Sequence, residues 1–260
     1  MLWEEYVYGK QTYKQLAEKC KRSIKTVQRH LDKAVVVLTP KQRREIIVLM
    51  DTTYFGRGFG VMVFKDAVSG DNVLKKYLKH ETIALYQQGI ATLQQQGYTI
   101  RAIVCDGKKG LLQSFGAIPV QMCQFHQVAI VIRYLTKKPK LAAAIELKAI
   151  MHLLARTDKA SFEGAVKQWY CKWESFLNER TLDAYTSKSR YTHRRLRSAY
   201  RSIKTNLPWL FTWYDYFPLT IPNTTNALDG HFADLKNKLR NHNGLSLKRK
   251  MKFIDEFLKA

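Results

Sequence analysis

The sequence predicts an α/β protein in which helices pack on a mixed sheet and a small helical unit comes first. Two apolar runs, "IIVLM" (46–50) and "IRAIVC" (100–105), have the continuous hydrophobicity of buried central strands. Between them, "FGVMVFKDAVS" (59–69) and "NVLKKYLKH" (72–80) flank the turn "SGDN", a pattern that indicates antiparallel neighbours. Together these observations predict the sheet.

The order of the expected elements defines the architecture more closely. Strands are expected at 46–53, 59–69, 72–80, 100–107 and 119–126, and helices at 81–97, at 108–116 and from 127 onward. Three strands, a helix, a strand, a helix, a strand and a helix are typical of the ribonuclease-H-like fold. We therefore expect the first part of such a core over 44–138 and its C-terminal helices over 216–260.

Residues 139–215 separate the two parts of the expected core. No strand pattern is evident in them, so an all-helical insertion is the simplest interpretation. Aromatic and apolar residues recur there at helical spacing, and we expect them in the core rather than stacked on bases: Phe162, Val166, Trp169, Trp173 and Phe176.

Residues 1–38 are expected to form a helix-turn-helix. Thr12 and Ser23 are suited to cap two short helices, each with an apolar stripe on one side. The stripes consist of Leu16, Ala17, Ile24, Val27 and Leu31. The second helix would present these side chains to DNA: Lys25, Gln28 and Arg29. The alternative is an ordinary helical hairpin, and Lys21 stands where such turns favour glycine.

The composition favours a nucleic-acid partner. The chain has 260 residues, with 44 Lys and Arg against 21 Asp and Glu and a formal net charge of +23. Self-repulsion on this scale favours a polyanion, here double-stranded DNA, whereas an anionic membrane surface is the rarer alternative. No apolar run is long enough to predict a membrane span. The four scattered cysteines argue against a disulfide framework and favour a cytoplasmic, nucleoid-associated setting.

Two basic segments are expected to hold the DNA backbone. One spans residues 186–206, which contain seven Lys and Arg residues and no acid, and the other follows Asp229. The candidate contacts are Arg194, Arg195, Arg197, Arg201, Lys236, Lys238 and Arg240. A face that is merely solvated is the alternative.

Three aspartates form the candidate catalytic site. Asp51 and Asp106 each follow a buried apolar run, where a carboxylate is costly unless its charge is compensated. A shared divalent cation would compensate it, and strand ends are where α/β sheets bind ligands. Asp229 would add a third carboxylate from the first turn of a helix. Two metals on three carboxylates would support in-line phosphoryl transfer. The alternative is that each aspartate only caps the next turn.

Four segments resemble the conserved blocks of DDE/D transposases of the bacterial insertion-sequence and mutator-like group. They are "MDTTYFGRG", "VCDGKKGL", "MCQFH" and "TTNALDGHFADLKNKLR", in this order and with a helical insertion before the last. The resemblance implies a ribonuclease-H-like core, Mg²⁺ or Mn²⁺ as two bound ions, element-end and target DNA as substrates, and a homodimer or larger homo-oligomer on DNA. It assigns Asp51, Asp106 and Asp229 to the three acidic positions, although the third is normally Glu in this group.

Cys123 and His126 match a Cys-x-x-His pair typical of the same group. We expect a structural or DNA-proximal pair at the end of the fifth strand. Half of a zinc site is an alternative, but no second half with suitable spacing exists in the sequence. A cysteine–histidine nucleophile is a further alternative, which a basic DNA-binding chain does not call for.

The sequence therefore predicts a transposase that binds element ends and catalyses metal-dependent strand cleavage and strand transfer. The alternative from a different class is a non-catalytic DNA-binding protein, either a repressor or an inactive transposase remnant. A nuclease that processes RNA on the same fold is a third interpretation, against which the predicted helix-turn-helix argues.

Overall fold

The computed structural model of the chain describes residues 2–38, 41–182, 185 and 187–259. Residue 186, the first of the predicted basic segment, lies outside them. The strands are β1 Glu45–Phe55, β2 Phe59–Asp66, β3 Asn72–Leu78, β4 Thr99–Cys105, β5 Val120–Met122, β6 Arg180–Leu182 and β7 Ser189–Tyr191. The helices are α1 Leu2–Val7, α2 Tyr13–Cys20, α3 Ile24–Lys33, α4 Ile83–Gln95, α5 Gln124–Leu135, α6 Ala142–Leu153, α7 Lys159–Asn178, α8 Arg194–Leu210, α9 Thr212–Asp215, α10 Asn226–Arg240 and α11 Leu247–Leu258, with a 3₁₀ turn at Phe217–Leu219.

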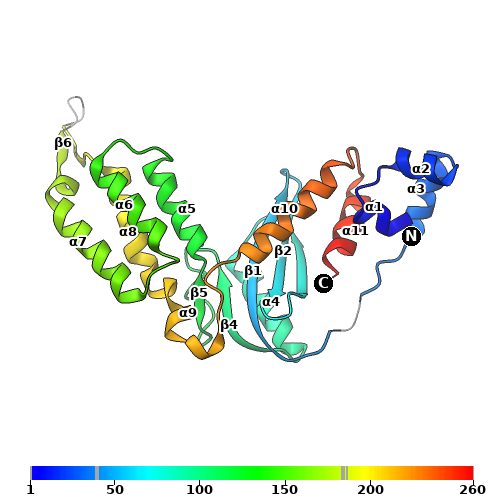
Figure 1. The fold of residues 1–260 in the computed structure, drawn as a ribbon, viewed down its shortest axis with the longest axis horizontal. Helices are drawn as coiled ribbons and strands as arrows, with labels where there is room; N and C mark the ends of the chain where they lie inside the picture. Colours follow the sequence, from blue (N-terminus) through cyan, green and yellow to red (C-terminus); the bar gives the residue numbers. More distant parts are fainter. Residues whose placement is uncertain (1, 39–40, 183–184, 186, 260) are drawn as a thin grey trace. The chain divides into compact units, whose positions relative to one another are not determined.

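The five-stranded sheet confirms the predicted ribonuclease-H-like topology. Its strand order is β3-β2-β1-β4-β5, so β1 lies in the centre (Figure 1). β2 and β3 are antiparallel, with Gly60 opposite Leu78, whereas β4 and β5 are parallel, with Ile103 opposite Val120. The sheet is therefore mixed, as expected.

Burial explains why these segments form central strands. Residues 46–50 of β1 are all buried, and so are residues 61–64 of β2 and 102–105 of β4. A strand that is apolar on both faces needs cover on both sides, which this fold supplies with helices. Helix α4, capped by the Thr82 hydroxyl, contributes to that cover by packing Tyr86 edge-on against Phe64.

The chain divides into two compact units. One consists of Met1–Glu45, Met50–Thr99 and Asn226–Ala260, and the other of Ile46–Leu49 and Ile100–Thr225. The first therefore contains the N-terminal helices, β2, β3, α4 and the two last helices. The second contains β4, β5 and the helical segment that follows.

The N-terminal helices largely match the sequence prediction. The Thr12 hydroxyl accepts a hydrogen bond from the Gln15 N–H, and the Ser23 hydroxyl caps α3 in the same way. Lys21, in place of a glycine, adopts the left-handed conformation (φ 50°) that closes α2. Two details were not predicted: α1 precedes these helices, and Ile24 is 46% exposed rather than packed inward.

Helix α11 connects the N-terminal helices to the sheet within the first unit. Arg249 forms a two-pronged ion pair with Asp32, at 2.6 and 2.9 Å. On the sheet side, the Asn72 side-chain amide donates to the carbonyl of Leu258 and the Tyr77 hydroxyl donates to Asp255. The three helices before β1 are thus fixed to their unit through contacts far apart in sequence.

In the second unit, α5 packs against α6 and α8, and α6 against α7 (Figure 1). The predicted helical character of this segment is confirmed, with one addition. The short strands β6 and β7 pair between α7 and α8, with Arg180 opposite Tyr191. Here the guanidinium groups of Arg180 and Arg197 lie over the Tyr191 ring, at 4.5 and 3.6 Å from its centroid.

Two expectations from the sequence were wrong: a helix over 108–116 and the end of the fifth strand. Residues 109–116 form a series of turns instead of a helix, because Gly110 (φ 85°) and Gly116 (φ 60°) adopt conformations that interrupt one. The fifth strand ends at Met122 rather than 126, and α5 begins at Gln124. His126 therefore belongs to the first turn of a helix.

Substitution of Gly89 in α4 tests how closely this helix packs on the sheet. A Cβ at this position would overlap the ring of Phe64, whereas a Cβ at Gly164 of α7 would meet no atom within 4 Å. We expect Gly89→Ala to reduce the free energy of unfolding by about 1–3 kcal/mol through overpacking. The matched change Gly164→Ala should increase it by about 0.5–1 kcal/mol through helix propensity. Thermal melting of both variants checks the opposite signs, and a stabilised Gly89→Ala protein would contradict the packing.

Candidate metal centre

Asp51 lies within the central strand, directly after its buried apolar run. Its side chain is half-buried, and Oδ1 accepts a hydrogen bond of 2.7 Å from the N–H of Thr52. The Thr52 hydroxyl is in turn 3.0 Å from the Tyr86 hydroxyl, which donates to Glu81. Because the strand and these bonds fix the backbone here, the position of the carboxylate is well defined.

Asp229 occupies the first turn of α10, as the sequence predicted. The helix buries its apolar side through Leu228, Phe232, Leu235 and Leu239. Asp229 itself is half-buried, and its Oδ2 is buried without a hydrogen-bond partner among the described residues. The N–H groups at the helix start favour a negative charge at this place. A buried carboxylate oxygen without a hydrogen bond is nevertheless costly, so this atom has the properties of a cation ligand.

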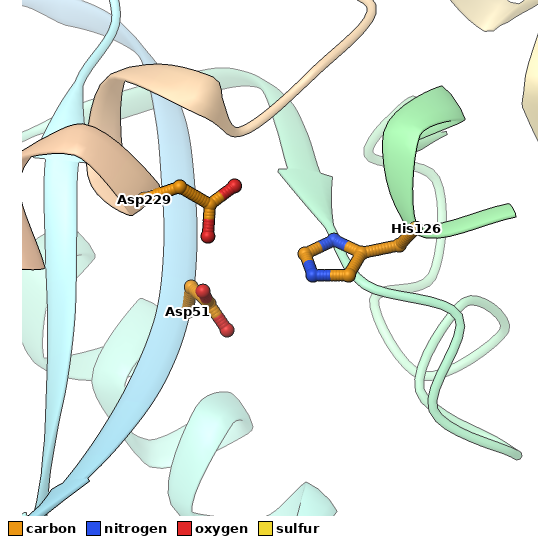
Figure 2. Close-up of side chains that lie close together, drawn as sticks. All are labelled: Asp51, His126 and Asp229. Carbon is orange, nitrogen blue, oxygen red and sulfur yellow. The ribbon is translucent and has the colours of Figure 1, made fainter. Parts of the chain in front are cut away.

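The carboxylates of Asp51 and Asp229 lie close together. A ligand oxygen of one is within 4.8 Å of a ligand oxygen of the other, and Figure 2 shows the two side chains near each other. Both aspartates belong to the same compact unit, which contains Met50–Thr99 and Asn226–Ala260. The sequence predicted their proximity.

His126 and Cys123 lie together at the start of α5. Cys123 is the residue before the helix, and its buried sulfur accepts hydrogen bonds of 3.3 Å from the N–H and the hydroxyl of Thr225. Burial alone would raise the pKa of the Cys123 thiol, but hydrogen bonds with His126 and Thr225 outweigh it and lower that pKa. The Cys-x-x-His spacing thus holds the two side chains on one helical turn. Thr225 was missed by the sequence analysis, although it belongs to the polar run just before α10.

Asp106 is the first residue after β4 and is half-buried. Its Oδ1 accepts a hydrogen bond of 3.2 Å from the N–H of Lys108. This hydrogen bond is the turn-capping contact that the sequence analysis kept as an alternative for each aspartate.

The two carboxylates fit a divalent cation. Carboxylate oxygens are preferred by Mg²⁺ and Mn²⁺. Opposite ligands of one Mg²⁺ ion lie about 4.2 Å apart, twice the usual bond of about 2.1 Å, so separations up to 4.8 Å need only small side-chain movements. The unsatisfied Oδ2 of Asp229 is the observation in favour of an ion at this place.

The candidate DNA-contacting residues differ in their exposure and in whether their side chains already bond to other groups of the protein. On α3, Lys25 and Arg29 are exposed and Gln28 is half-buried. On α8, Arg194 and Arg201 are exposed, whereas Arg195 donates to the carbonyl of Arg133 and Arg197 to that of Leu177. On α10, Lys238 pairs with Asp234, whereas Lys236 has no ion pair among the described residues and Arg240 reaches only the side chain of Asn237.

Metal binding is predicted to depend on Asp229. We expect Mn²⁺ to raise the melting temperature of the wild-type protein by several degrees over its value in EDTA, because an ion that binds only the folded state stabilises it. In Asp229→Asn this increase should be lost. Asp234→Asn, which removes the same charge from the same helix, should keep the increase. Equal increases in all three proteins would contradict the assignment of Asp229 as a ligand.

The sequence matches no protein-family model and no curated protein. None of the described helices combines the length and apolar character that crossing a membrane requires.

Proposed function

We propose that this chain is a DNA transposase that binds element ends and catalyses metal-dependent strand cleavage and strand transfer. The observation that carries the proposal is the pair of carboxylates Asp51 and Asp229, on the central strand and on a basic helix of one unit. Two carboxylates without a cation repel each other, and a ribonuclease-H-like sheet is a scaffold on which a metal between them can act on a phosphodiester.

Each part of the chain has a role in this proposal. Bound divalent ions would supply an activated water or 3′-hydroxyl and would stabilise the leaving oxygen. Asp51 and Asp229 would hold those ions. Exposed cations on α3, α8 and α10 neutralise DNA phosphates, and α3, the second helix of the helix-turn-helix, presents Lys25 and Arg29 to a groove. The excess of positive charge supports a polyanionic substrate.

Asp106 gives weight to a second candidate function. Its carboxylate accepts a hydrogen bond from the N–H of Lys108, as expected of an aspartate that only caps the next turn. A chain that binds DNA but lacks a competent third carboxylate would be a repressor or an inactive relative of a transposase. Cleavage, rather than binding, separates these two candidates.

The test is cleavage of a labelled duplex that carries the end of the source element, with Mg²⁺ or Mn²⁺. We expect wild type to nick this duplex and Asp51→Asn and Asp229→Asn each to lower the rate by about 100-fold or more, because each removes a metal ligand. DNA affinity in EDTA should be the same for all three proteins. Asp229→Glu should retain cleavage if the longer acid can still reach the ion.

Asp234→Asn on α10 is the matched control and should cleave at the wild-type rate. Asp106→Asn shows whether the second predicted acid contributes. If wild type binds the duplex without nicking it and Asp229→Glu does not restore nicking, the non-catalytic candidate replaces the transposase. Nicking that persists in Asp51→Asn would mean that another site, or another protein, cuts the DNA.

A further inference from the structure

A pocket lies at the end of β1 and α10, within the unit that carries Asp51 and Asp229. Its volume is about 400 Å³, which is within the range of pockets that bind small organic ligands. Tyr54 and Phe55 at the end of β1 form one part of the lining, and Lys236, Arg240 and Lys250 form another. None of the lining residues is acidic.

The cations of this region fall into two classes. Lys238 pairs with Asp234, Arg249 pairs with Asp32, and Lys252 donates to the carbonyl of Leu31. By contrast, the three cations that line the pocket form no ion pair with any described residue: Lys236, Arg240 and Lys250. The protein thus binds Lys238, Arg249 and Lys252 internally and leaves the three cations of the pocket available for an anion.

Helix geometry relates the pocket to the carboxylates. Lys236 is 7 positions after Asp229 (236 − 229) and Arg240 is 11 positions after it (240 − 229). At 100° per residue both lie within about 20° of the direction of Asp229, so the three side chains share one face of α10. At about 1.5 Å per residue, Lys236 is about 10 Å along the helix from the candidate metal ligand.

The geometry of β1 also relates the pocket to the carboxylates. Phe55 is 4 positions after Asp51 (55 − 51) and, because side chains alternate, it points to the same face of β1. The distance along the strand is about 13 Å. The helix and the strand that carry the two carboxylates therefore both continue to the pocket. A duplex strand advances about 3.4 Å per nucleotide, so this separation corresponds to about three or four nucleotides.

We propose that this pocket is a subsite for a nucleotide of the DNA strand that is cut, about three or four positions from the cleaved phosphate. Lys236, Arg240 and Lys250 hold the phosphates on either side of that nucleotide. The Phe55 ring packs against its sugar or base, as aromatic side chains do in nucleic-acid grooves. This inference rests on the proposed function, because it assigns a position on the same substrate.

The first experiment measures binding without metal, so that cleavage has no influence on it. The probe is a fluorescein-labelled duplex of about 30 base pairs, titrated with the full chain in EDTA at several salt concentrations. Lys236→Gln/Lys250→Gln is compared with Lys79→Gln/Lys167→Gln. The control pair removes the same charge from exposed positions that do not line the pocket.

We expect the pocket variant to bind about tenfold more weakly than the control variant. The slope of log affinity against log salt should fall by about 2, since each lost phosphate contact removes about 1. Equal losses in the two double variants would mean that only net charge matters and would overturn the subsite. Wild-type affinity in the pocket variant would overturn it as well. Melting temperatures show whether each variant is folded.

A second variant tests the ring without changing the charge. Phe55→Leu should weaken binding about fivefold and leave the salt slope unchanged, because it removes an aromatic contact and no phosphate contact. If Phe55→Leu binds DNA with wild-type affinity, only the cations of the pocket contribute to binding, and the nucleotide subsite is overturned.

Cleavage with Mn²⁺, measured separately, distinguishes failure of this inference from failure of the proposed function. If wild type cleaves the element end and the pocket variants bind like the controls, the subsite is wrong and the transposase stands. If binding depends on the pocket but no protein cleaves, the subsite stands as a DNA contact and the catalytic proposal is wrong.

Discussion

The closeness of two carboxylates, Asp51 and Asp229, is the constraint on which the rest of the site depends. Two negative charges a few ångströms apart repel each other, and a half-buried environment strengthens the repulsion because water screens it less. The fold maintains the arrangement with a rigid central strand on one side and the start of a helix on the other. The N–H groups of that helix start reduce the cost, and a divalent cation would remove it.

Helix α10 carries its acidic and basic residues at opposite ends. Its first turn carries the acid at the favourable positive end of the helix, and its last turns carry Lys236, Lys238 and Arg240, which suit the negative end. The same order that stabilises the helix thus separates the proposed metal-binding end from the proposed phosphate-binding end. α11 then returns the chain past β3, where Tyr77 and Asn72 bind it.

Local signals in the sequence were sufficient for the sheet and for the helix caps. Two kinds of signal are local, because each involves only a few consecutive residues. They are the apolar runs, which predict β1 and β4, and the capping hydroxyls, which come from Thr12 and Ser23. The start of α5 was misjudged because Cys123 offers no capping hydrogen bond and the mixed polar and apolar pattern of β5 continues through Gln124 and Phe125. The closeness of Asp51 and Asp229 depends on tertiary packing between residues 178 positions apart (229 − 51), so it was expected from the order of the elements and not from a local pattern.

The excess of Lys and Arg in this chain makes the lack of a hydrogen-bond partner for Asp229 Oδ2 evidence about the role of Asp229. The chain has 44 Lys and Arg and only 21 acids, so a given carboxylate is surrounded by potential partners. Several acids are indeed neutralised in this way, as Asp32 is by Arg249 and Asp66 by Arg44. Asp229, on a helix rich in lysine, nevertheless keeps a buried oxygen without any hydrogen bond among the described residues. Of the cations on this helix, Lys236 and Arg240 line the pocket and Lys238 pairs with Asp234. In a protein this basic, a carboxylate kept apart from lysine and arginine is better explained by a metal ligand than by a structural ion pair.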